Sequence, residues 1–521
     1  SIIYPYVMQD HISRDKVDRT YKALFMENEF LKVMCLPELG GRLHSVLDKT
    51  EGKEMFHFNG VIKPGMIAMR GARISGGVEW NHGPHGHTVT AISPVNAIHG
   101  NNPDGSAYLE ISNEEQIFCT RWTVRVTLRP GRAYLDEQIC LSNPTDGMHP
   151  YYFWNCTAFP NGPGTRFIYP MTLGTDHNAR EFFRWPIHQG RDLTWLKNYP
   201  RYTSIFAVNC SYDFFGAYDV ERQRGIVQVA DHHLLPGKKA WTWGEWAFGK
   251  TAESNLADES PHYIEVQSGP LPTQSDYGML GPRQRITWQE WWYPVHGLGG
   301  GFEYATREVA VQTSRQKGRL DLRLLATCQF DQAACRFERE GRPAVRKILN
   351  LSPKTPVGVT LDDAGSDPVA VTITSKNGEI LARFTTPLPI PLVSPPALRE
   401  ERDDAKMNVE ELYLKGRKLD RETNRLKARE YYEKALAADP GHVESLRALA
   451  VLDFESALYD KAAERLGKAL ARDGDDGLGH YFLGVCCLQT NDFEKAVHHG
   501  YQSVKCEGTV SIGYDLVGRA R

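Results

Sequence analysis

The segment that decides the fold is Leu36–Val46, which reads LPELGGRLHSV. A mostly apolar run that begins at Phe30 precedes it and is typical of a β-strand. Gly40 and Gly41 permit the tight backbone turn that would bring the chain back alongside this strand. The segment therefore predicts a β-hairpin near the start of the chain.

Short alternating runs continue beyond this hairpin. The run Ile117–Leu128 is closed by Pro130-Gly131, and the run Ala133–Leu141 is closed by Asn143-Pro144. A later run covers His262–Val266. Strands separated by turn signals, with no long helical periodicity between them, favour a large antiparallel sandwich or barrel over an α/β fold.

The hairpin segment Leu36–Val46 resembles the first hairpin of galactose mutarotase-like proteins, which include aldose 1-epimerases and are built on a β-supersandwich. The run that ends in Trp291–Val295 is similar to a bacterial domain of formerly unassigned function (DUF5107-type) that is commonly followed by tetratricopeptide repeats. The resemblance implies an antiparallel β-supersandwich over residues 1–306, with a carbohydrate cleft across one concave sheet.

Aldose epimerases use a glutamate late in the fold as base and a histidine on a central strand as acid. The run Tyr263–Gly269 supplies Glu265, which lies between two apolar residues and so faces the other side of a sheet. The central run Pro150–Cys156 carries Trp154 and Asn155 and contains no histidine. The sequence therefore departs from the epimerase pattern at the acid.

The segment Gly76–Thr88 gathers ionisable side chains between glycines and a proline, and this composition predicts an irregular loop that forms the wall of a site. Glu79 supplies a carboxylate, and His82, His85 and His87 supply imidazoles. These groups could ligate a metal, but a loop fixes no ligand geometry, and no HExxH helix or cysteine cluster accompanies them. We expect hydrogen bonds to sugar hydroxyls instead, and no metal.

A further segment, Asp231–Trp246, is rich in tryptophan. Trp241 and Trp243 share one face of an extended chain and could stack on a sugar ring. Lys239 and Glu245 fall on the same face, where the cation could hold a hydroxyl and the carboxylate could substitute in catalysis. A tryptophan-rich strand packed in the core remains the alternative.

Glycoside hydrolysis needs two carboxyl groups across the scissile bond, one protonated and one ionised. Glu265 and Glu79 are the predicted catalytic pair, with Glu245 in reserve, and the predicted activity is that of a glycoside hydrolase. The predicted substrate-binding residues are Trp80, Asn81, His82, His85, His87, Trp154, Asn155, His232, His233, Lys239, Trp241, Trp243 and Gln267. An aldose epimerase or mutarotase and a non-catalytic sugar-binding or sensing module stay open as alternatives.

The chain changes character after the first domain. Residues 307–386 contain alternating runs on either side of Asn377-Gly378, a strong hairpin signal that predicts a small accessory β-sandwich. The proline-rich stretch 387–404 predicts an extended linker. From 405 to 521 small residues recur every 34 positions, which is the spacing of tetratricopeptide repeats; examples are Gly416, Ala450 and Gly484. Such repeats predict a protein partner, self-association or a structural buttress.

The 521 residues carry a net charge of -3 with no basic run, so we expect no nucleic-acid partner. No apolar run is long enough to cross a bilayer, which argues against a membrane protein. The ten cysteines form no CxxC pair and indicate free thiols, which favours the cytoplasm. A removed leader stays open because the chain begins at Ser1. Nucleotide and redox motifs are missing, so we expect no cofactor.

Overall fold

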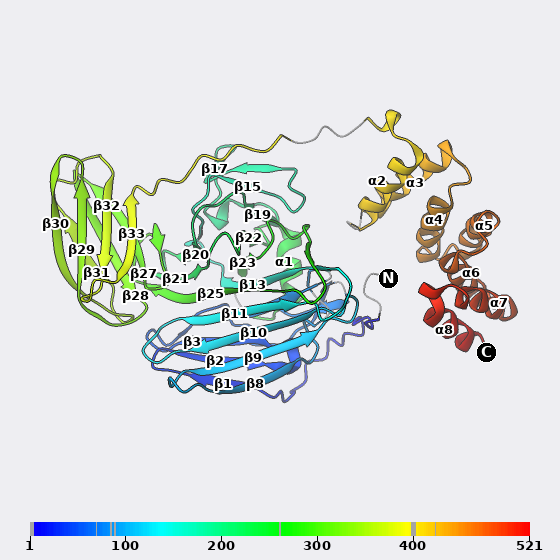
Figure 1. Ribbon diagram of the computed structural model, residues 1–521, viewed down its shortest axis with the longest axis horizontal. Coiled ribbons are helices and arrows are strands. Elements are labelled where there is room, and N and C mark those ends of the chain that lie inside the picture. Colours follow the sequence, from blue (N-terminus) through cyan, green and yellow to red (C-terminus); the bar gives the residue numbers. More distant parts are fainter. Residues whose placement is uncertain are drawn as a thin grey trace. The chain divides into compact units, whose positions relative to one another are not determined.

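The computed structural model describes residues 5–68, 70–83, 86–87, 90–259, 262–397, 403–421 and 424–521 (Figure 1). The chain forms two compact units, Ser1–Pro396 and Ala397–Arg521. The first unit consists of antiparallel sheets and the second of helices. The predicted multidomain architecture, mainly β with a C-terminal helical array, is therefore confirmed.

Two large sheets form the N-terminal sandwich. The first contains eleven strands. In spatial order they are β1 (Leu24–Glu27), β2 (Leu31–Leu36), β3 (Arg42–Asp48), β7 (Val78–His82), β13 (Phe153–Pro160), β23 (Tyr263–Gly269), β22 (Gly237–Thr242), β19 (Thr203–Ala207), β15 (Leu173–Thr175) and β16 (Phe182–Arg184), with β4 (Lys53–Glu54) paired to β3. The second contains eight strands. These are β14 (Thr165–Ile168), β20 (Phe214–Asp219), β21 (Arg224–Val229), β25 (Arg285–His296), β11 (Leu135–Ser142), β10 (Arg121–Leu128), β9 (Ala107–Glu114) and β8 (Asn96–Asn101).

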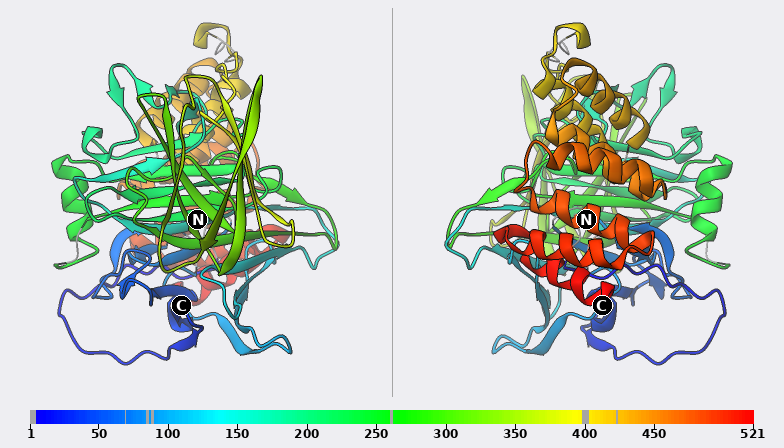
Figure 2. Two further views of the ribbon diagram at one scale, coloured as in Figure 1. Left: turned by 90° about the vertical axis from the view of Figure 1, so that its left-hand side faces the viewer. Right: turned by 90° about the vertical axis from the view of Figure 1, so that its right-hand side faces the viewer.

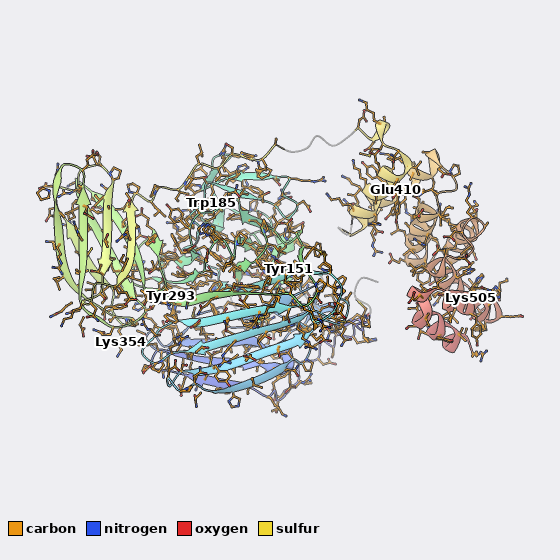
Figure 3. All side chains as sticks on the ribbon, viewed as in Figure 1. Tyr151, Trp185, Tyr293, Lys354, Glu410 and Lys505 are labelled. Carbon is orange, nitrogen blue, oxygen red and sulfur yellow. The ribbon has the colours of Figure 1, made fainter. Side chains whose placement is uncertain are left out.

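Smaller elements decorate the first sandwich. They are the strand pairs β5 (Gly65–Ala68) with β6 (Gly71–Arg73), β12 (His149–Tyr151) with β24 (Gly278–Leu280), and β17 (Ile187–His188) with β18 (Arg191–Asp192), together with helix α1 (Ala247–Ser254). Alternate residues of the two large sheets meet in one apolar core, which includes Leu43, Val78, Phe153 and Ile264. Figure 3 shows the side chains that fill this sandwich.

The predicted hairpin is confirmed, because β2 pairs antiparallel with β3. A short 3-10 turn, Pro37–Leu39, joins them, and Gly40 and Gly41 follow with φ angles of 71° and 68°. A Cβ atom on Gly41 would lie 2.8 Å from Ile111 Cδ1 in the core. Glycine is therefore required there both by the backbone conformation and by the close packing of the two sheets.

The prediction of an irregular loop over Gly76–Thr88 is wrong for its first half. Val78–His82 forms β7, a fully buried strand between β3 and β13. Gly77 has a φ of 62°, and a Cβ atom there would lie 2.0 Å from Leu43 O, so the glycines serve the tight entrance to the strand. Residues 84–85 and 88, and with them His85, lie outside the described residues.

Two four-stranded sheets follow and pack around a second apolar core (Figure 2). One contains β26 (Tyr304–Ala305), β27 (Val309–Gln316), β28 (Arg319–Ala326) and β31 (Val357–Leu361). The other contains β30 (Arg342–Leu351), β29 (Phe330–Arg339), β32 (Val369–Thr374) and β33 (Ile380–Thr386). Asn377-Gly378 lies in the turn between the paired strands β32 and β33, so this hairpin prediction is confirmed.

The proline-rich segment lies along the first sandwich. The Thr172 hydroxyl donates to Pro391 O over 2.8 Å, the Tyr212 hydroxyl donates to Pro389 O over 2.9 Å, and Arg184 Nη1 donates to Val393 O over 3.1 Å. The segment is therefore anchored by its carbonyl groups, which an extended chain leaves free to accept hydrogen bonds.

The second unit is a helical array. Its helices are α2 (Val409–Arg421), α3 (Arg425–Ala438), α4 (Val443–Glu455), α5 (Tyr459–Leu470), α6 (Gly477–Gln489), α7 (Phe493–Val504) and α8 (Val510–Ala520). Small residues of the 34-residue period lie where helices touch: a Cβ atom on Gly416 would lie 2.7 Å from the Tyr432 ring, and one on Gly484 would lie 2.5 Å from Leu516 Cδ2. None of the helices in the described parts of the chain is long and apolar enough to cross a membrane.

Candidate functional site

The candidate site lies on the outer face of the eleven-stranded sheet, which points away from the eight-stranded sheet. Directly opposed residues of antiparallel strands point to the same side. Cys156 on β13 is opposed to Glu79 on β7, and Trp241 on β22 is opposed to Glu265 on β23. Gln267 lies two residues beyond Glu265 and therefore shares this face.

An arginine connects the two predicted catalytic glutamates. Arg73 Nε lies 3.2 Å from Glu79 Oε2, and Arg73 Nη2 pairs with Glu265 Oε1. Arg42 Nη2 lies 2.6 Å from the same Glu79 Oε2. All four side chains are at most 3% exposed. The glutamates are thus brought together as a network with two guanidinium groups.

This network keeps both carboxyl groups ionised. Burial by itself raises the pKa of Glu79, but Arg73, His87 and Arg42 outweigh it and hold the pKa well below its usual range. Burial likewise opposes ionisation of Glu265, and Arg73 again reverses the effect, so the pKa of Glu265 is also lowered. Neither group is therefore available as a protonated acid at neutral pH.

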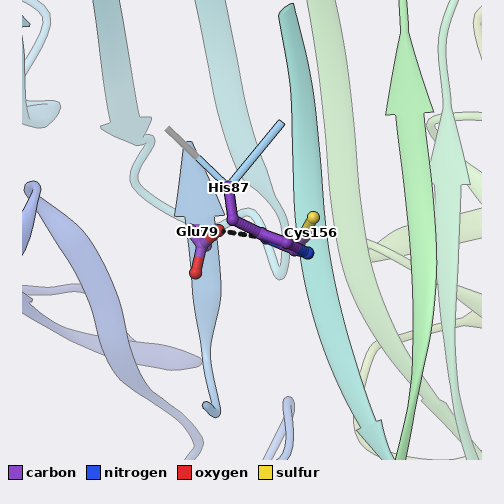
Figure 4. A group of neighbouring side chains, drawn as sticks. All are labelled: Glu79, His87 and Cys156. Carbon is purple, nitrogen blue, oxygen red and sulfur yellow. Dashed lines mark hydrogen bonds and ion pairs between the residues drawn. The ribbon is translucent and has the colours of Figure 1, made fainter. Parts of the chain in front are cut away.

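His87 lies beside Glu79 on β7 and Cys156 on β13 (Figure 4). Its Nδ1 is 2.9 Å from Glu79 Oε1, and its side chain is 29% exposed, far more than the carboxylates. An ionised carboxylate can only accept, so Nδ1 carries the proton and Nε2 is left for a ligand. Burial and the nearby Arg73 lower the pKa of His87, which keeps the imidazole neutral at neutral pH.

Glu79, His87 and Cys156 could in principle hold a metal ion, because their ligand atoms lie within 4.8 Å of one another. Burial, however, raises the pKa of the Cys156 thiol well above its usual range, and metals bind the thiolate. The carboxylate of Glu79 is also already paired with two cations, Arg42 and Arg73. The electrostatics of these three groups therefore disfavour a cation.

A chain of hydrogen bonds joins a lysine to Glu265. Lys239 Nζ donates to Gln274 Oε1 over 2.7 Å, Gln274 Nε2 donates to Gln267 Oε1 over 2.8 Å, and Gln267 Nε2 donates to Glu265 Oε2. His177 Nε2 also lies 3.1 Å from Gln274 Oε1. Burial lowers the pKa of Lys239 to about 8, which makes this ammonium group a better proton donor than an ordinary lysine.

Residues 1–295 match a family described as a domain of unknown function, DUF5107. The match covers more than half of the 521 residues. The chain belongs to the DUF5107 family. Residues 304–384 match the second domain of YphG-like proteins, and residues 423–480 match a tetratricopeptide repeat.

One solved structure shares the fold of this DUF5107 protein, and others are similar to part of it. A TPR-domain containing protein from Parabacteroides distasonis is 18% identical, and the alignment covers 95% of this chain and 74% of that one with a TM-score of 0.54. A galactose mutarotase-like protein from Clostridium acetobutylicum is 11% identical over 53% of this chain and 96% of its own, with a TM-score of 0.40.

Within the DUF5107 region, three residues predicted to bind substrate point into the core between the two sheets. Trp80 packs in the core and donates from Nε1 to Gly41 O over 3.0 Å. His82 Nε2 lies 3.0 Å from the Thr120 hydroxyl. Asn155 Nδ2 donates to Ser268 Oγ over 2.7 Å. These three predictions are corrected. Successive side chains of a strand point to opposite faces of the sheet, and these residues point to the face opposite Glu79.

Other predicted residues lie on the outer face or apart from the site. Asn81 donates to Cys156 Sγ over 2.9 Å, and Trp154 is fully buried beside Phe206. Trp243 packs in a separate apolar cluster that includes Ala252 of α1 and Leu256 just after it. The prediction that Trp243 stacks on a sugar ring is therefore corrected.

The remaining predicted residues lie in exposed positions away from the carboxylates. Glu245 follows β22, is half exposed and lies 3.5 Å from Lys250. His232 and His233 lie in an exposed turn after β21, paired with Asp213 and Asp231. Glu245 pairs with Lys250, whereas Arg73 pairs with Glu79 and Glu265, so the role of Glu245 as a substitute catalytic carboxylate is corrected.

Sequence reasoning missed five side chains that complete the site, namely Arg42, Arg73, Cys156, His177 and Gln274. Arg42 was visible as a charged residue inside an apolar strand pattern, which is a signal for a buried ion pair. Arg73 gave no such signal, because it ends a strand of only three residues and pairs with Glu265, which is 192 positions away.

Proposed function

We propose that this protein is a carbohydrate-directed enzyme that interconverts the anomers of a free sugar, as an aldose 1-epimerase does. The observation that carries this proposal is the position of Arg73 between Glu79 and Glu265, which keeps both carboxyl groups ionised. The outer-face site thus offers bases and weak acids rather than a protonated carboxylic acid.

This difference favours anomer exchange over glycoside hydrolysis. Hydrolysis needs a carboxylic acid that is kept protonated, so that it can donate to the leaving oxygen. Anomer exchange needs only one proton taken from the hydroxyl on C1 and one proton given to the ring oxygen. An ionised carboxylate and an ammonium group with a pKa of about 8 match these two demands.

Glu265 and Lys239 are the proposed proton-transfer pair. They are diagonal neighbours on the paired strands β23 and β22. The backbone positions of two diagonal neighbours are about 7–8 Å apart, so that long side chains can meet. Glu265 removes the proton of the C1 hydroxyl while Lys239 protonates the ring oxygen, so the C1–O5 bond breaks and an aldehyde forms. Rotation about C1–C2 and the reverse transfers close the ring as the other anomer.

The remaining groups would orient the sugar. His87 Nε2 can accept a hydrogen bond from a hydroxyl, because Nδ1 already donates to Glu79. Gln267 and Gln274 link Lys239 to Glu265 and would hold both groups at a fixed spacing. Such fixed polar groups lower the reorganisation that the reaction requires.

The test is a proton NMR time course with freshly dissolved α-anomers of common aldoses. We expect the chain to accelerate the approach to anomeric equilibrium and Glu265→Gln and Lys239→Met to abolish the acceleration. Glu245→Gln is the matched control, since this half-exposed carboxylate lies outside the network, and it should leave the rate unchanged. New reducing ends from α- or β-linked glycosides, lost in Glu265→Gln, would replace the proposal by hydrolysis. No effect on either substrate class would favour a binding module.

A further inference from the structure

A cleft of about 660 Å³ lies next to the strand that carries Glu265, lined by residues between Asp176 and Ile205 together with Trp241 and Trp246. It borders β15, β16, β19 and β22, the half of the eleven-stranded sheet beyond Glu265. Its volume falls within the range of about 300–1,000 Å³ that is typical of small-molecule sites. The proposed proton transfers use only the neighbourhood of Glu265 and leave this space without a role.

The cleft and the carboxylates share one face of the sheet. Ser204 on β19 is opposed to Trp241 on β22, and Trp241 is opposed to Glu265 on β23. These three residues therefore form one row on the outer face, with the first two lining the cleft. His177 also lines the cleft and reaches Lys239 through Gln274. A ligand that fills the cleft and extends across Trp241 would thus reach Glu265 on the neighbouring strand.

The rim of the cleft exposes aromatic side chains. Trp246 is 56% exposed and Tyr202 is 55% exposed, although both are large and apolar. Trp241 continues the aromatic surface inward and is half-buried. Polar residues such as Asn198 and Arg201 also line the cleft. Flat apolar surfaces interleaved with hydrogen-bonding groups match the two sides of a sugar ring, which has an apolar face and a hydroxyl edge.

We propose that this cleft binds the sugar units that precede the reducing end of an oligosaccharide, with the reducing-end unit placed at Glu265. This inference rests on the proposed function, because it assigns the substrate class of the same site. A single sugar fills the carboxylate end, whereas a di- or trisaccharide also covers Trp241 and stacks on Trp246. The preferred substrate is then an oligosaccharide with a free anomeric carbon.

The test compares binding and turnover across chain length. Intrinsic tryptophan fluorescence is titrated with gluco-, galacto-, manno- and xylo-oligosaccharides of one to three units. For the sugar series that binds, we expect affinity to rise with length, and Trp246→Ala to lower trisaccharide affinity about three- to tenfold while leaving the monosaccharide unchanged. Phe25→Ala is the matched control, because Phe25 is an equally exposed aromatic residue, 57%, on the distant edge strand β1.

The outcomes separate the two proposals. Accelerated anomer exchange of monosaccharides without any gain for longer chains would leave the proposed function standing and overturn the cleft assignment. Length-dependent binding that is sensitive to Trp246→Ala, but with no anomer exchange, would support the cleft and overturn the enzymatic function. Glu265→Gln should abolish exchange and keep the length dependence. Absence of binding across the whole panel would overturn the cleft assignment as well.

Discussion

Replacing Arg73 by methionine tests the electrostatic basis of the site. Met is of similar length and apolar, so the variant removes the charge with little change of volume. Arg73 is 3% exposed and pairs with two carboxylates that are 2% exposed. Removing one partner of a buried ion pair costs about 3–5 kcal/mol, because the other charge stays buried without compensation. Glu79 keeps Arg42 at 2.6 Å, so the loss falls mainly on Glu265.

The penalty of Arg73→Met should depend on pH in a defined direction. In the unaltered protein the pKa of Glu265 is lowered, so its stabilisation is present at neutral pH and is lost as pH falls through that pKa. In the variant burial is opposed only by the smaller effects of His87 and Lys239, so the pKa of Glu265 rises, and the stability that the neutral carboxyl group contributes at low pH is lost as pH rises. Both effects reduce the difference in unfolding free energy between the unaltered protein and the variant as pH falls. The titration of Glu265 alone changes this difference by at most about 1.4 kcal/mol per pH unit.

Urea unfolding followed by tryptophan fluorescence measures this penalty without interference from the helical array. All 11 tryptophans precede residue 293, so the signal reports on the first sandwich. Arg73→Met should lose about 3–5 kcal/mol at pH 7.5 and clearly less at pH 5, and adding Glu265→Gln should restore part of the loss. Arg125→Met, which breaks the half-buried pair with Glu110, is the control and should cost less than about 1 kcal/mol. A penalty that is independent of pH would refute the reasoning.

Three further outcomes are expected. Lys239→Arg keeps the charge, but the guanidinium does not release its proton, so anomer exchange should fall strongly. The rate profile of the variant should also lack the decline through pH 8 that we expect for the unaltered protein. Burial, and to a lesser extent Glu290, raise the pKa of Glu137, so the folded state becomes less stable as pH rises and the unfolded state releases this proton. Glu137→Gln removes this cost and should therefore raise the thermal midpoint more at pH 9 than at pH 5. A Cβ atom on Gly269 would lie 2.5 Å from the Trp154 ring, so Gly269→Ala should cost about 1–3 kcal/mol in urea unfolding.

Most of the fold could be predicted from the sequence, because the signals for its hairpins and helical repeats are local. The Gly40-Gly41 hairpin, the Asn377-Gly378 turn and the 34-residue helical period each depend on residues close together in the chain. β7 was missed because the glycines before it and the Gly83-Pro84 pair after it hide a strand of only five residues. The turn signals mark the two ends of this strand, but they do not reveal that the residues between them are extended.

The site could be predicted only in part, since its contacts join distant segments. Glu79 and Glu265 were identified from residue type and alternation, yet the arginine that unites them lies on a short strand with no periodic signal. Alternation could have separated Glu79 and Asn81 from Trp80 and His82, once that segment was recognised as a strand. The ionisation of the carboxyl groups depends on burial and on Arg73, and neither can be read from composition.

Two-dimensional exchange NMR of a free aldose at anomeric equilibrium tests the central claim most directly. Cross-peaks between the α and β anomeric protons report interconversion alone, without any change in concentration. We predict cross-peaks in the presence of the chain, their loss in Glu265→Gln and their retention in Glu245→Gln. Exchange no faster than in buffer, for every aldose and reducing oligosaccharide supplied, would contradict the assignment of the outer-face site as an epimerase.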